Sequence, residues 1–188
     1  MKITQAEYWK ALVPGTTLPE DHPPIIAFIG RSNVGKSSFI NAITGKKDLC
    51  RSGSTPGVTR KINLFLINQS LIFADLPGYG YAKMSRGERK KLEELIFWFL
   101  TLPKLRLQQV FLLVDSRLGP TDNDLEMAGF LSSRNIPTTV ITSKIDKLTS
   151  SQKKALLAGI SQQLPHHRII PFSIHDRESM KTVLNSLP

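Results

Sequence analysis

Eight residues, at positions 30–37, constrain the fold of this chain more than any other stretch. They read G-R-S-N-V-G-K-S, which matches the phosphate-binding P-loop pattern G-x-x-x-x-G-K-S. The unbroken apolar run at 25–29 that precedes them is typical of a buried parallel strand, and residues 38–43 indicate a helix that ends at Gly45. Strand, loop and helix in this order predict a phosphate-binding α/β domain.

Each residue type in this loop has a physical reason for its place. Gly30 and Gly35 let the backbone turn and approach an anion closely. Successive backbone N–H groups can then point inward at the positive end of a helix. Lys36 adds a full positive charge for the β- and γ-phosphates, and the Ser37 hydroxyl is a hard oxygen ligand suited to Mg²⁺. The residues expected to bind the phosphates are Gly30, Arg31, Ser32, Asn33, Val34, Gly35, Lys36, Ser37 and Ser38.

Beyond the P-loop, apolar strand patterns alternate with amphipathic helix patterns, which predicts an α/β sheet covered by helices on both faces. Residues 62–67 and 71–74 form a predicted hairpin whose first strand lies at the edge of the sheet. Residues 1–24 form an N-terminal extension packed on the domain, which itself spans 25–188. Further strands are expected at 110–114, 138–142 and 169–172, and helices are expected to open at the capping pairs Ser85 with Glu88, Thr121 with Asp124 and Thr149 with Gln152.

Charge and cysteine content set limits on partners and location. The 188 residues include 25 Lys and Arg against 15 Asp and Glu, a net charge of +10. That balance fits a polyanionic partner such as RNA and equally a generally basic surface. The single cysteine, Cys50, excludes an internal disulfide, and we interpret it as an incidental thiol. With no signal-peptide pattern and no membrane-spanning run, a cytoplasmic protein is expected.

Two further segments are candidates for sensing a γ-phosphate. The stretch at 46–61 is basic, lacks strand or helix periodicity and is rich in turn residues, as functional loops often are. Within it Thr59 could place a hydroxyl on Mg²⁺, with Thr55 as the rival. Asp75 could hold Mg²⁺ through a water, and the Gly78 N–H could bond the γ-phosphate, which makes the following loop a nucleotide-sensitive switch. The residues expected to contact nucleotide here are Gly57, Val58, Thr59, Arg60, Lys61, Asp75, Leu76, Pro77 and Gly78.

The segment Ser-Lys-Ile-Asp at 143–146 is the candidate for reading the base. Guanine offers its N1–H and 2-amino donors side by side, and one carboxylate can accept both, whereas adenine presents a bare N1 there. Asp146 therefore favours GTP over ATP, and the Lys144 stem can lie along the base plane. Backbone N–H groups of Ser173 and Ile174 would bond the guanine oxygen. The residues expected around the base are Thr142, Ser143, Lys144, Asp146, Phe172, Ser173 and Ile174.

Together these segments resemble the Era/EngA/TrmE-like GTPases related to translation factors, and most closely the EngB (YihA/YsxC) family of bacterial ribosome-biogenesis GTPases. The resemblance rests on G-R-S-N-V-G-K-S-S at 30–38, S-G-S-T-P-G-V-T at 52–59, D-L-P-G-Y-G-Y-A at 75–82, K-I-D-K-L at 144–148 and P-F-S at 171–173.

The resemblance implies a three-layer P-loop GTPase fold, with a six-stranded, mostly parallel sheet and one antiparallel edge strand. It also implies binding of GTP, GDP and Mg²⁺, with Ser37 and Thr59 as direct metal ligands. The implied role is assembly of the large ribosomal subunit, through ribosomal RNA and proteins, with a requirement for normal cell division and septation. Departures from the family pattern are Arg60 for Gln, Ser143 for Thr, Ile174 for Ser or Ala, and Ser179 for Gly.

The expected reaction is attack of water on the γ-phosphate, with the transferring charge stabilised by Lys36, Mg²⁺ and backbone N–H groups. Tyr79 stands where many GTPases carry a water-orienting Gln, so the intrinsic rate should be slow. Asn33 resembles the asparagine that holds K⁺ in related GTPases, which makes K⁺ a hypothetical cofactor. The expected catalytic residues are Lys36, Thr59, Gly78 and Asn33.

Two alternatives remain open at this point. A P-loop ATPase or nucleotide kinase would leave Asp146 unexplained. A basic RNA-binding module with a vestigial P-loop would leave the intact set of Lys36, Ser37 and Asp75 unexplained. We expect a monomeric GTPase switch with no membrane association.

Overall fold

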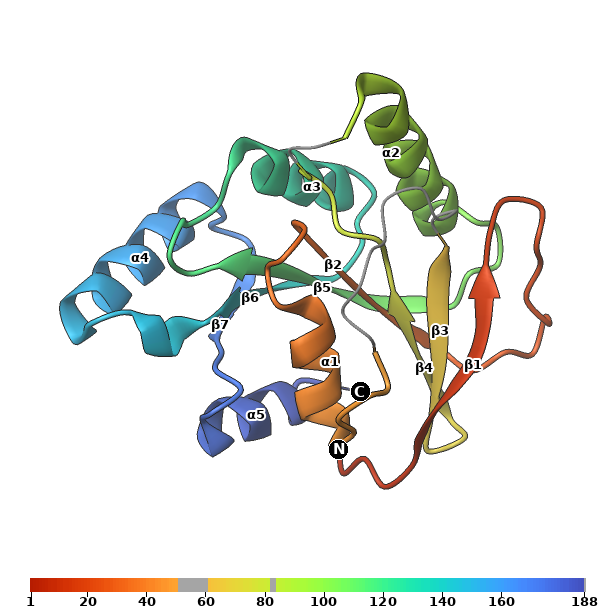
Figure 1. Cartoon of the computed structure of the whole chain (residues 1–188), viewed down its shortest axis with the longest axis horizontal. Helices are drawn as coiled ribbons and strands as arrows, with labels where there is room; N and C mark the ends of the chain where they lie inside the picture. The colour runs from red at the N-terminus through yellow and green to blue at the C-terminus, as the bar shows by residue number, and fades with distance from the viewer. Residues whose placement is uncertain (51–60, 82–83, 188) are drawn as a thin grey trace.

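The computed structural model describes residues 1–50, 61–81 and 84–187. In this part of the chain seven strands form one sheet in the order β1-β3-β4-β2-β5-β6-β7, with helices on both of its faces (Figure 1). The strands are β1 (Ala6–Leu12), β2 (Ile25–Gly30), β3 (Ile62–Ile67), β4 (Leu71–Asp75), β5 (Leu107–Asp115), β6 (Thr138–Ser143) and β7 (Arg168–Pro171). The helices are α1 (Lys36–Thr44), α2 (Arg86–Leu100), α3 (Asp122–Ser133), the short 3₁₀ helix η1 (Ile145–Lys147), α4 (Ser150–Gln163) and α5 (Arg177–Leu184).

The α/β class and the alternation of strands with helices are confirmed, but two details of the predicted sheet are wrong. The sheet has a seventh strand, β1, which comes from the N-terminal extension and pairs antiparallel with β3 from Ala6 opposite Ile67 to Leu12 opposite Ile62. Consequently β3, although antiparallel to both of its neighbours, lies inside the sheet rather than at its edge. Pairing with β1 satisfies backbone groups that an edge strand would leave open.

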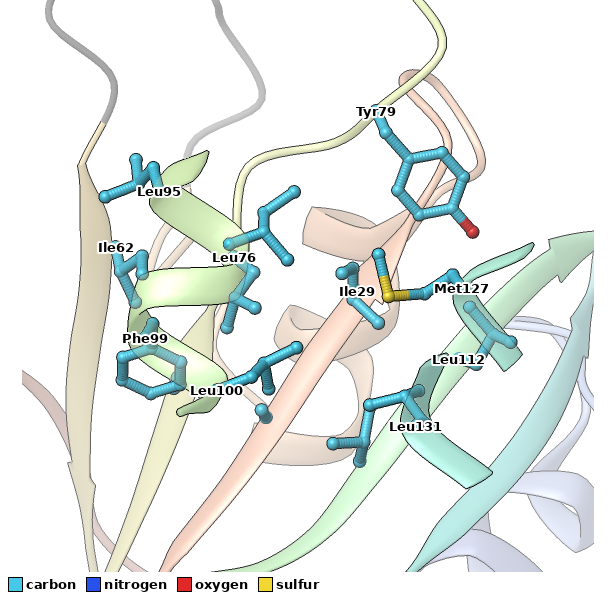
Figure 2. Close-up of a cluster of buried hydrophobic side chains, with 14 of the residues drawn as sticks. Ile29, Ile62, Leu76, Tyr79, Leu95, Phe99, Leu100, Leu112, Met127 and Leu131 are labelled. Atoms are coloured by element: carbon cyan, nitrogen blue, oxygen red, sulfur yellow. The ribbon is translucent and has the colours of Figure 1, made fainter. Parts of the chain in front are cut away.

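Two apolar layers hold the helices to the sheet, and β2 supplies both of them because successive side chains of a strand point to opposite faces. Ile25, Ala27 and Ile29 face the layer shared with α2, α3 and α4, part of which Figure 2 shows. On the opposite face Phe28 packs against phenylalanines of neighbouring elements, and α1 and α5 cover them. The aromatic cluster on this second face consists of Phe28, Phe39, Phe73, Phe111 and Phe172.

The predicted helix starts are confirmed by their caps. Ser85, Thr121 and Thr149 each form a capping box with the residue three positions later. Such caps contribute about 1 kcal/mol each to helix stability. Among the described residues, none of the helices combines the length and apolar character needed to cross a bilayer.

Candidate functional site

The P-loop runs from the end of β2 to the start of α1, and its backbone requires glycine at two points. Gly35 has φ 103°, a left-handed conformation that side chains disfavour. At Gly30 an added Cβ would lie 2.6 Å from the Leu113 carbonyl oxygen. In the described chain no side chain caps the N-terminus of α1. The positive end of that helix therefore stays open to an anion.

The side chains that follow the loop meet the end of β4. Lys36 forms an ion pair with Asp75 Oδ1, and both side chains are 11% exposed. The other carboxylate oxygen, Oδ2, accepts a hydrogen bond from Cys50 Sγ at 3.1 Å. Burial, followed by the negative charge of Asp75, raises the pKa of the Cys50 thiol, and a hydrogen bond with the Ser37 side chain opposes that rise. Cys50 thus lies against Asp75, and its burial and raised pKa agree with its interpretation as an incidental thiol rather than a nucleophile.

The loop after β4 is bonded directly to the P-loop. The Ser32 N–H donates to the Tyr79 carbonyl at 2.8 Å, and the Tyr79 N–H donates to the Gly30 carbonyl at 3.3 Å. The Ser32 hydroxyl donates to the Gly78 carbonyl at 3.2 Å. The approach is so close that a Cβ on Gly78 would lie 2.9 Å from the Ser32 nitrogen. Movement of this predicted switch loop therefore requires breaking its bonds to the P-loop itself.

The Tyr79 side chain lies in the core layer beside Met127 of α3 (Figure 2). Its hydroxyl donates to Asp124 Oδ1 at 2.6 Å. The second oxygen, Oδ2, accepts from the N–H and the hydroxyl of Thr121, at 2.9 and 2.7 Å. Burial and the nearby Asp124 charge raise the pKa of Tyr79 well above its usual value. The sequence identified Asp124 only as a helix cap, because nothing local indicates its contact with Tyr79.

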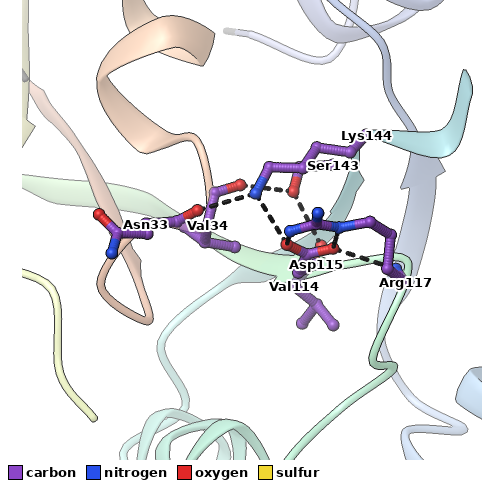
Figure 3. Close-up of polar contacts among 7 residues, drawn as sticks. All are labelled: Asn33, Val34, Val114, Asp115, Arg117, Ser143 and Lys144. Atoms are coloured by element: carbon purple, nitrogen blue, oxygen red, sulfur yellow. Dashed lines mark hydrogen bonds and ion pairs between the residues drawn. The ribbon is translucent and has the colours of Figure 1, made fainter. Parts of the chain in front are cut away.

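At the end of β6 two side chains bind the P-loop (Figure 3). The Ser143 hydroxyl donates to the Val34 carbonyl at 2.7 Å. The Lys144 ammonium donates to the Asn33 carbonyl at 2.8 Å and to Asp115 Oδ2 at 2.8 Å. The predicted base-reading segment and the predicted phosphate loop therefore form one connected unit.

Asp115, at the end of β5, is a site residue that the sequence analysis did not select. Its carboxylate accepts from Arg117 Nε at 3.0 Å and Nη2 at 2.7 Å as well as from Lys144. Burial raises the pKa of Asp115, but the hydrogen bonds from Arg117 and Lys144 outweigh burial and hold it well below its usual value. An acidic residue at the carboxyl end of a buried strand was the available signal in the sequence.

The structure places Asp146 in η1, where its side chain is 29% exposed and its Oδ2 lies 3.4 Å from the Lys147 ammonium. A hydrogen bond from the Ser173 side chain lowers the pKa of Asp146, so the group is an ionised acceptor at neutral pH. The Ser173 N–H, expected to serve the guanine oxygen, donates instead to Ser179 Oγ at 3.3 Å. Ile174 is 46% exposed, whereas Thr142 and Phe172 are buried.

Some candidates occupy other places. Leu76 is a core residue of the α2 layer, and Lys61 is exposed just before β3. Predictions for the loop before β3 fall on residues outside the described chain. Those residues are Thr55, Gly57, Val58, Thr59 and Arg60.

The structure brings together a P-loop entering α1, an aspartate at the end of the neighbouring strand, and a lysine and an aspartate after β6. This is the arrangement that the sequence analysis predicts for a P-loop GTPase. Residues 25–144 match the family described as 50S ribosome-binding GTPase. The probable GTP-binding protein EngB of an Exiguobacterium strain is 42% identical, and the alignment covers 95% of this chain and 91% of that protein. The Clostridium kluyveri protein of the same name is 45% identical over 81% of this chain and 77% of its own length. This chain belongs to the EngB family of GTP-binding GTPases.

Solved structures agree with this assignment. A probable GTP-binding protein EngB has the same fold, with a TM-score of 0.68 and 24% identity, over 86% of this chain and 94% of its own. An Aquifex aeolicus Era variant bound to GDP and AlF₄⁻ gives a TM-score of 0.64 and 26% identity over 87% of this chain and 56% of that one. The family assignment excludes the ATPase and nucleotide-kinase alternative.

Proposed function

We propose that this protein is a GTP-dependent switch in the assembly of the large ribosomal subunit. The observation that carries the proposal is the match of residues 25–144 to a family described as 50S ribosome-binding GTPase. The net charge of +10 supports it, because ribosomal RNA offers a dense array of phosphates. An exposed basic cluster lies at the start of α2, beside the switch loop, and consists of Arg86, Arg89, Lys90 and Lys91. A link to cell division and a cytoplasmic location would follow from this role.

The donor set around Asp75 suits Mg²⁺. The Asp75 carboxylate accepts a hydrogen bond from the Cys50 thiol, and the Ser37 side chain lowers the pKa of that thiol, so both oxygen donors lie close to Cys50. We infer that Ser37 binds Mg²⁺ directly and that Asp75 does so through a water. Thr59, the other expected ligand, lies outside the described chain. Bound Mg²⁺ would supply positive charge for the phosphates, and Lys36 would exchange its ion pair with Asp75 for them.

The position of Tyr79 supports a slow intrinsic hydrolysis rate. Its hydroxyl is bonded to Asp124 inside the core, so this side chain is not placed to orient an attacking water. Asn33 is exposed at the rim of the P-loop, and among the described residues its side-chain amide makes no hydrogen bond. We infer that this amide takes part in binding K⁺, which would supply charge in place of an arginine finger. Equal hydrolysis rates in K⁺ and Na⁺ would contradict that role.

The experiment is co-sedimentation of the protein with separated ribosomal subunits, after loading with GDP or a non-hydrolysable GTP analogue, at low and moderate salt. Retention on the large subunit only with the GTP analogue, persisting at moderate salt, is expected. Equal, salt-sensitive binding to both subunits in either state would reduce the interaction to nonspecific attraction between charges. Binding that ignores nucleotide altogether would favour the RNA-binding module with a vestigial P-loop.

Two matched charge reversals sharpen this test. Lys90→Glu with Lys91→Glu alters the basic cluster of α2, whereas Lys153→Glu with Lys154→Glu makes the same change in charge on α4. If α2 binds ribosomal phosphates, only the first pair should weaken retention. It should also reduce the salt dependence, by roughly one unit of slope for each phosphate that the variant no longer neutralises. Equal weakening by both pairs would show that net charge alone governs binding.

A further inference from the structure

Asp115 lies at the centre of the polar cluster in Figure 3, between two cations that come from different segments. It is 8% exposed, and the Lys144 ammonium and the Arg117 guanidinium both donate to it. The Lys144 side chain is 29% exposed and the Arg117 side chain 53% exposed. The buried Asp115 carboxylate therefore binds two cations, the partly buried Lys144 ammonium and the more exposed Arg117 guanidinium.

The backbone on both sides of the Lys144 contact is left-handed. Lys144 has φ 59° and ψ 30°, and Asn33, whose carbonyl accepts from the Lys144 ammonium, has φ 67°. Asparagine adopts left-handed backbone readily, but at a lysine this conformation is costly and persists where surrounding contacts hold it. Within the described chain, Asp115 is the acidic partner of Lys144. Without the Asp115 carboxylate, the Lys144 ammonium would keep its hydrogen bond to the neutral Asn33 carbonyl and could turn toward solvent.

We propose that Asp115 is a positioning residue for guanine-nucleotide binding, which holds the Lys144 side chain across the P-loop so that its methylene stem presents a fixed surface to the base. This inference rests on the proposed base site, whose residues follow β6 and β7, and it adds to that site a residue at the end of β5. Asp146 reads the edge of the base, whereas Lys144 meets its plane. Asp115 therefore governs affinity for the base without governing the choice between guanine and hypoxanthine, which differ only in the 2-amino group.

The test is a set of equilibrium titrations with GDP and with IDP, which carries hypoxanthine, at constant Mg²⁺. Asp115→Asn keeps the size of the side chain and removes its charge, and it should weaken GDP and IDP by the same factor, about tenfold. Lys144→Met keeps an apolar stem and removes the ammonium, so it should produce a similar weakening without altering the buried carboxylate. Arg117→Ala leaves the bond between Lys144 and Asp115 in place, and a change below about threefold is expected.

The combination of Asp115→Asn with Lys144→Met decides between positioning and a general structural effect. If Asp115 acts through Lys144, the double variant should bind GDP no more weakly than either single variant, because the two changes remove one interaction. Effects that multiply, or an unchanged GDP affinity in Asp115→Asn, would overturn the inference. A changed ratio of GDP to IDP affinity would also overturn it. Failure of the unaltered protein to bind GDP would overturn the base site as well, which separates the two failures.

Discussion

Replacing Tyr79 by phenylalanine removes one oxygen atom from the protein interior and leaves the ring in place. The hydroxyl that is removed donates to Asp124 Oδ1 at 2.6 Å, and the two residues are 6% and 1% exposed. Asp124 keeps its bonds to Thr121 through Oδ2, so the cap of α3 remains. The variant therefore isolates the contribution of the single bond that joins the switch loop to α3.

The expected magnitude follows from the charge and burial of the acceptor. A hydrogen bond to a charged group contributes about 1.5–3 kcal/mol, and the acceptor left behind stays buried. We expect the free energy of unfolding to fall by about 2–3 kcal/mol. In a domain of this size each kcal/mol shifts Tm by roughly 2–4 °C, which gives a decrease of about 4–12 °C.

Urea denaturation of the nucleotide-free protein, followed by far-UV circular dichroism, measures the decrease in the free energy of unfolding. Tyr8→Phe is the matched control, because Tyr8 is 52% exposed and its ring packs edge-on against Phe65. The control should stay within about 0.5 kcal/mol of the unaltered protein. Equal destabilisation of both variants would refute the reasoning.

The raised pKa of Tyr79 adds a pH dependence to the same pair of proteins. The hydroxyl keeps its proton in the folded state, whereas in the unfolded chain it ionises near its usual value of about 10. The contribution of Tyr79 is therefore complete below that pH and is lost above it, by up to about 1.4 kcal/mol per pH unit. The stability difference between Tyr79→Phe and the unaltered protein should narrow between pH 9 and pH 11, and a constant difference would contradict the raised pKa.

Three further predictions concern the nucleotide site. Gly78→Ala should force the switch loop away from Ser32, since the new Cβ would lie 2.9 Å from the Ser32 nitrogen, and it should lower stability by about 1–3 kcal/mol in thermal unfolding. Cys50 is 4% exposed and the pKa of its thiol is raised. At pH 8 a disulfide reagent should therefore label Cys50 at least about 100-fold more slowly in the folded protein than in urea. Comparable labelling rates would contradict the burial of Cys50. Asp146→Asn should weaken GDP binding about 100-fold, because two hydrogen bonds to a carboxylate are removed. The same variant should bind XDP more tightly, because the 2-oxo group of xanthine can accept a hydrogen bond from the new amide. If Asp146 does not read the base, competition titrations would show the same order of GDP and XDP affinities in the variant and the unaltered protein.

The sequence predicts most of the fold because buried strands and one-sided helices leave periodic patterns. It misses β1 because the strand carries a bulge between Tyr8 and Lys10, which interrupts the alternation of inward and outward side chains. Its buried positions, Ala6 and Leu12, are separated by the exposed Tyr8. Only the partner strand, far along the chain, makes these residues a strand.

The candidate site likewise has parts that the sequence predicts and parts that it does not. The P-loop, the segment after β4 and the segment after β6 are contiguous, so their chemistry can be predicted from neighbouring residues. The contacts of Cys50 with Asp75, of Asp115 with Lys144 and of Asp124 with Tyr79 join segments far apart in the sequence. The position of Asp115 at the end of a buried strand marks it as a candidate, but no local pattern predicts its partner or the other two contacts. The expected role of Thr59 stays a prediction, because that residue lies outside the described chain.

The contact between Phe39 and Phe172 joins the two ends of the proposed nucleotide site. These rings lie 4.6 Å apart, edge to face, and each is 1% exposed, so the helix after the P-loop and the segment carrying Ser173 pack as one body. If the base binds beside Ser173 as proposed, then once the phosphates of a guanine nucleotide are bound, its base meets these groups at a high effective concentration. Guanosine or pyrophosphate alone would lack that advantage, so their binding free energies should add up to less than that of GDP. Affinity should therefore depend on the distance between the base and the phosphates of the ligand as well as on the chemistry of each end.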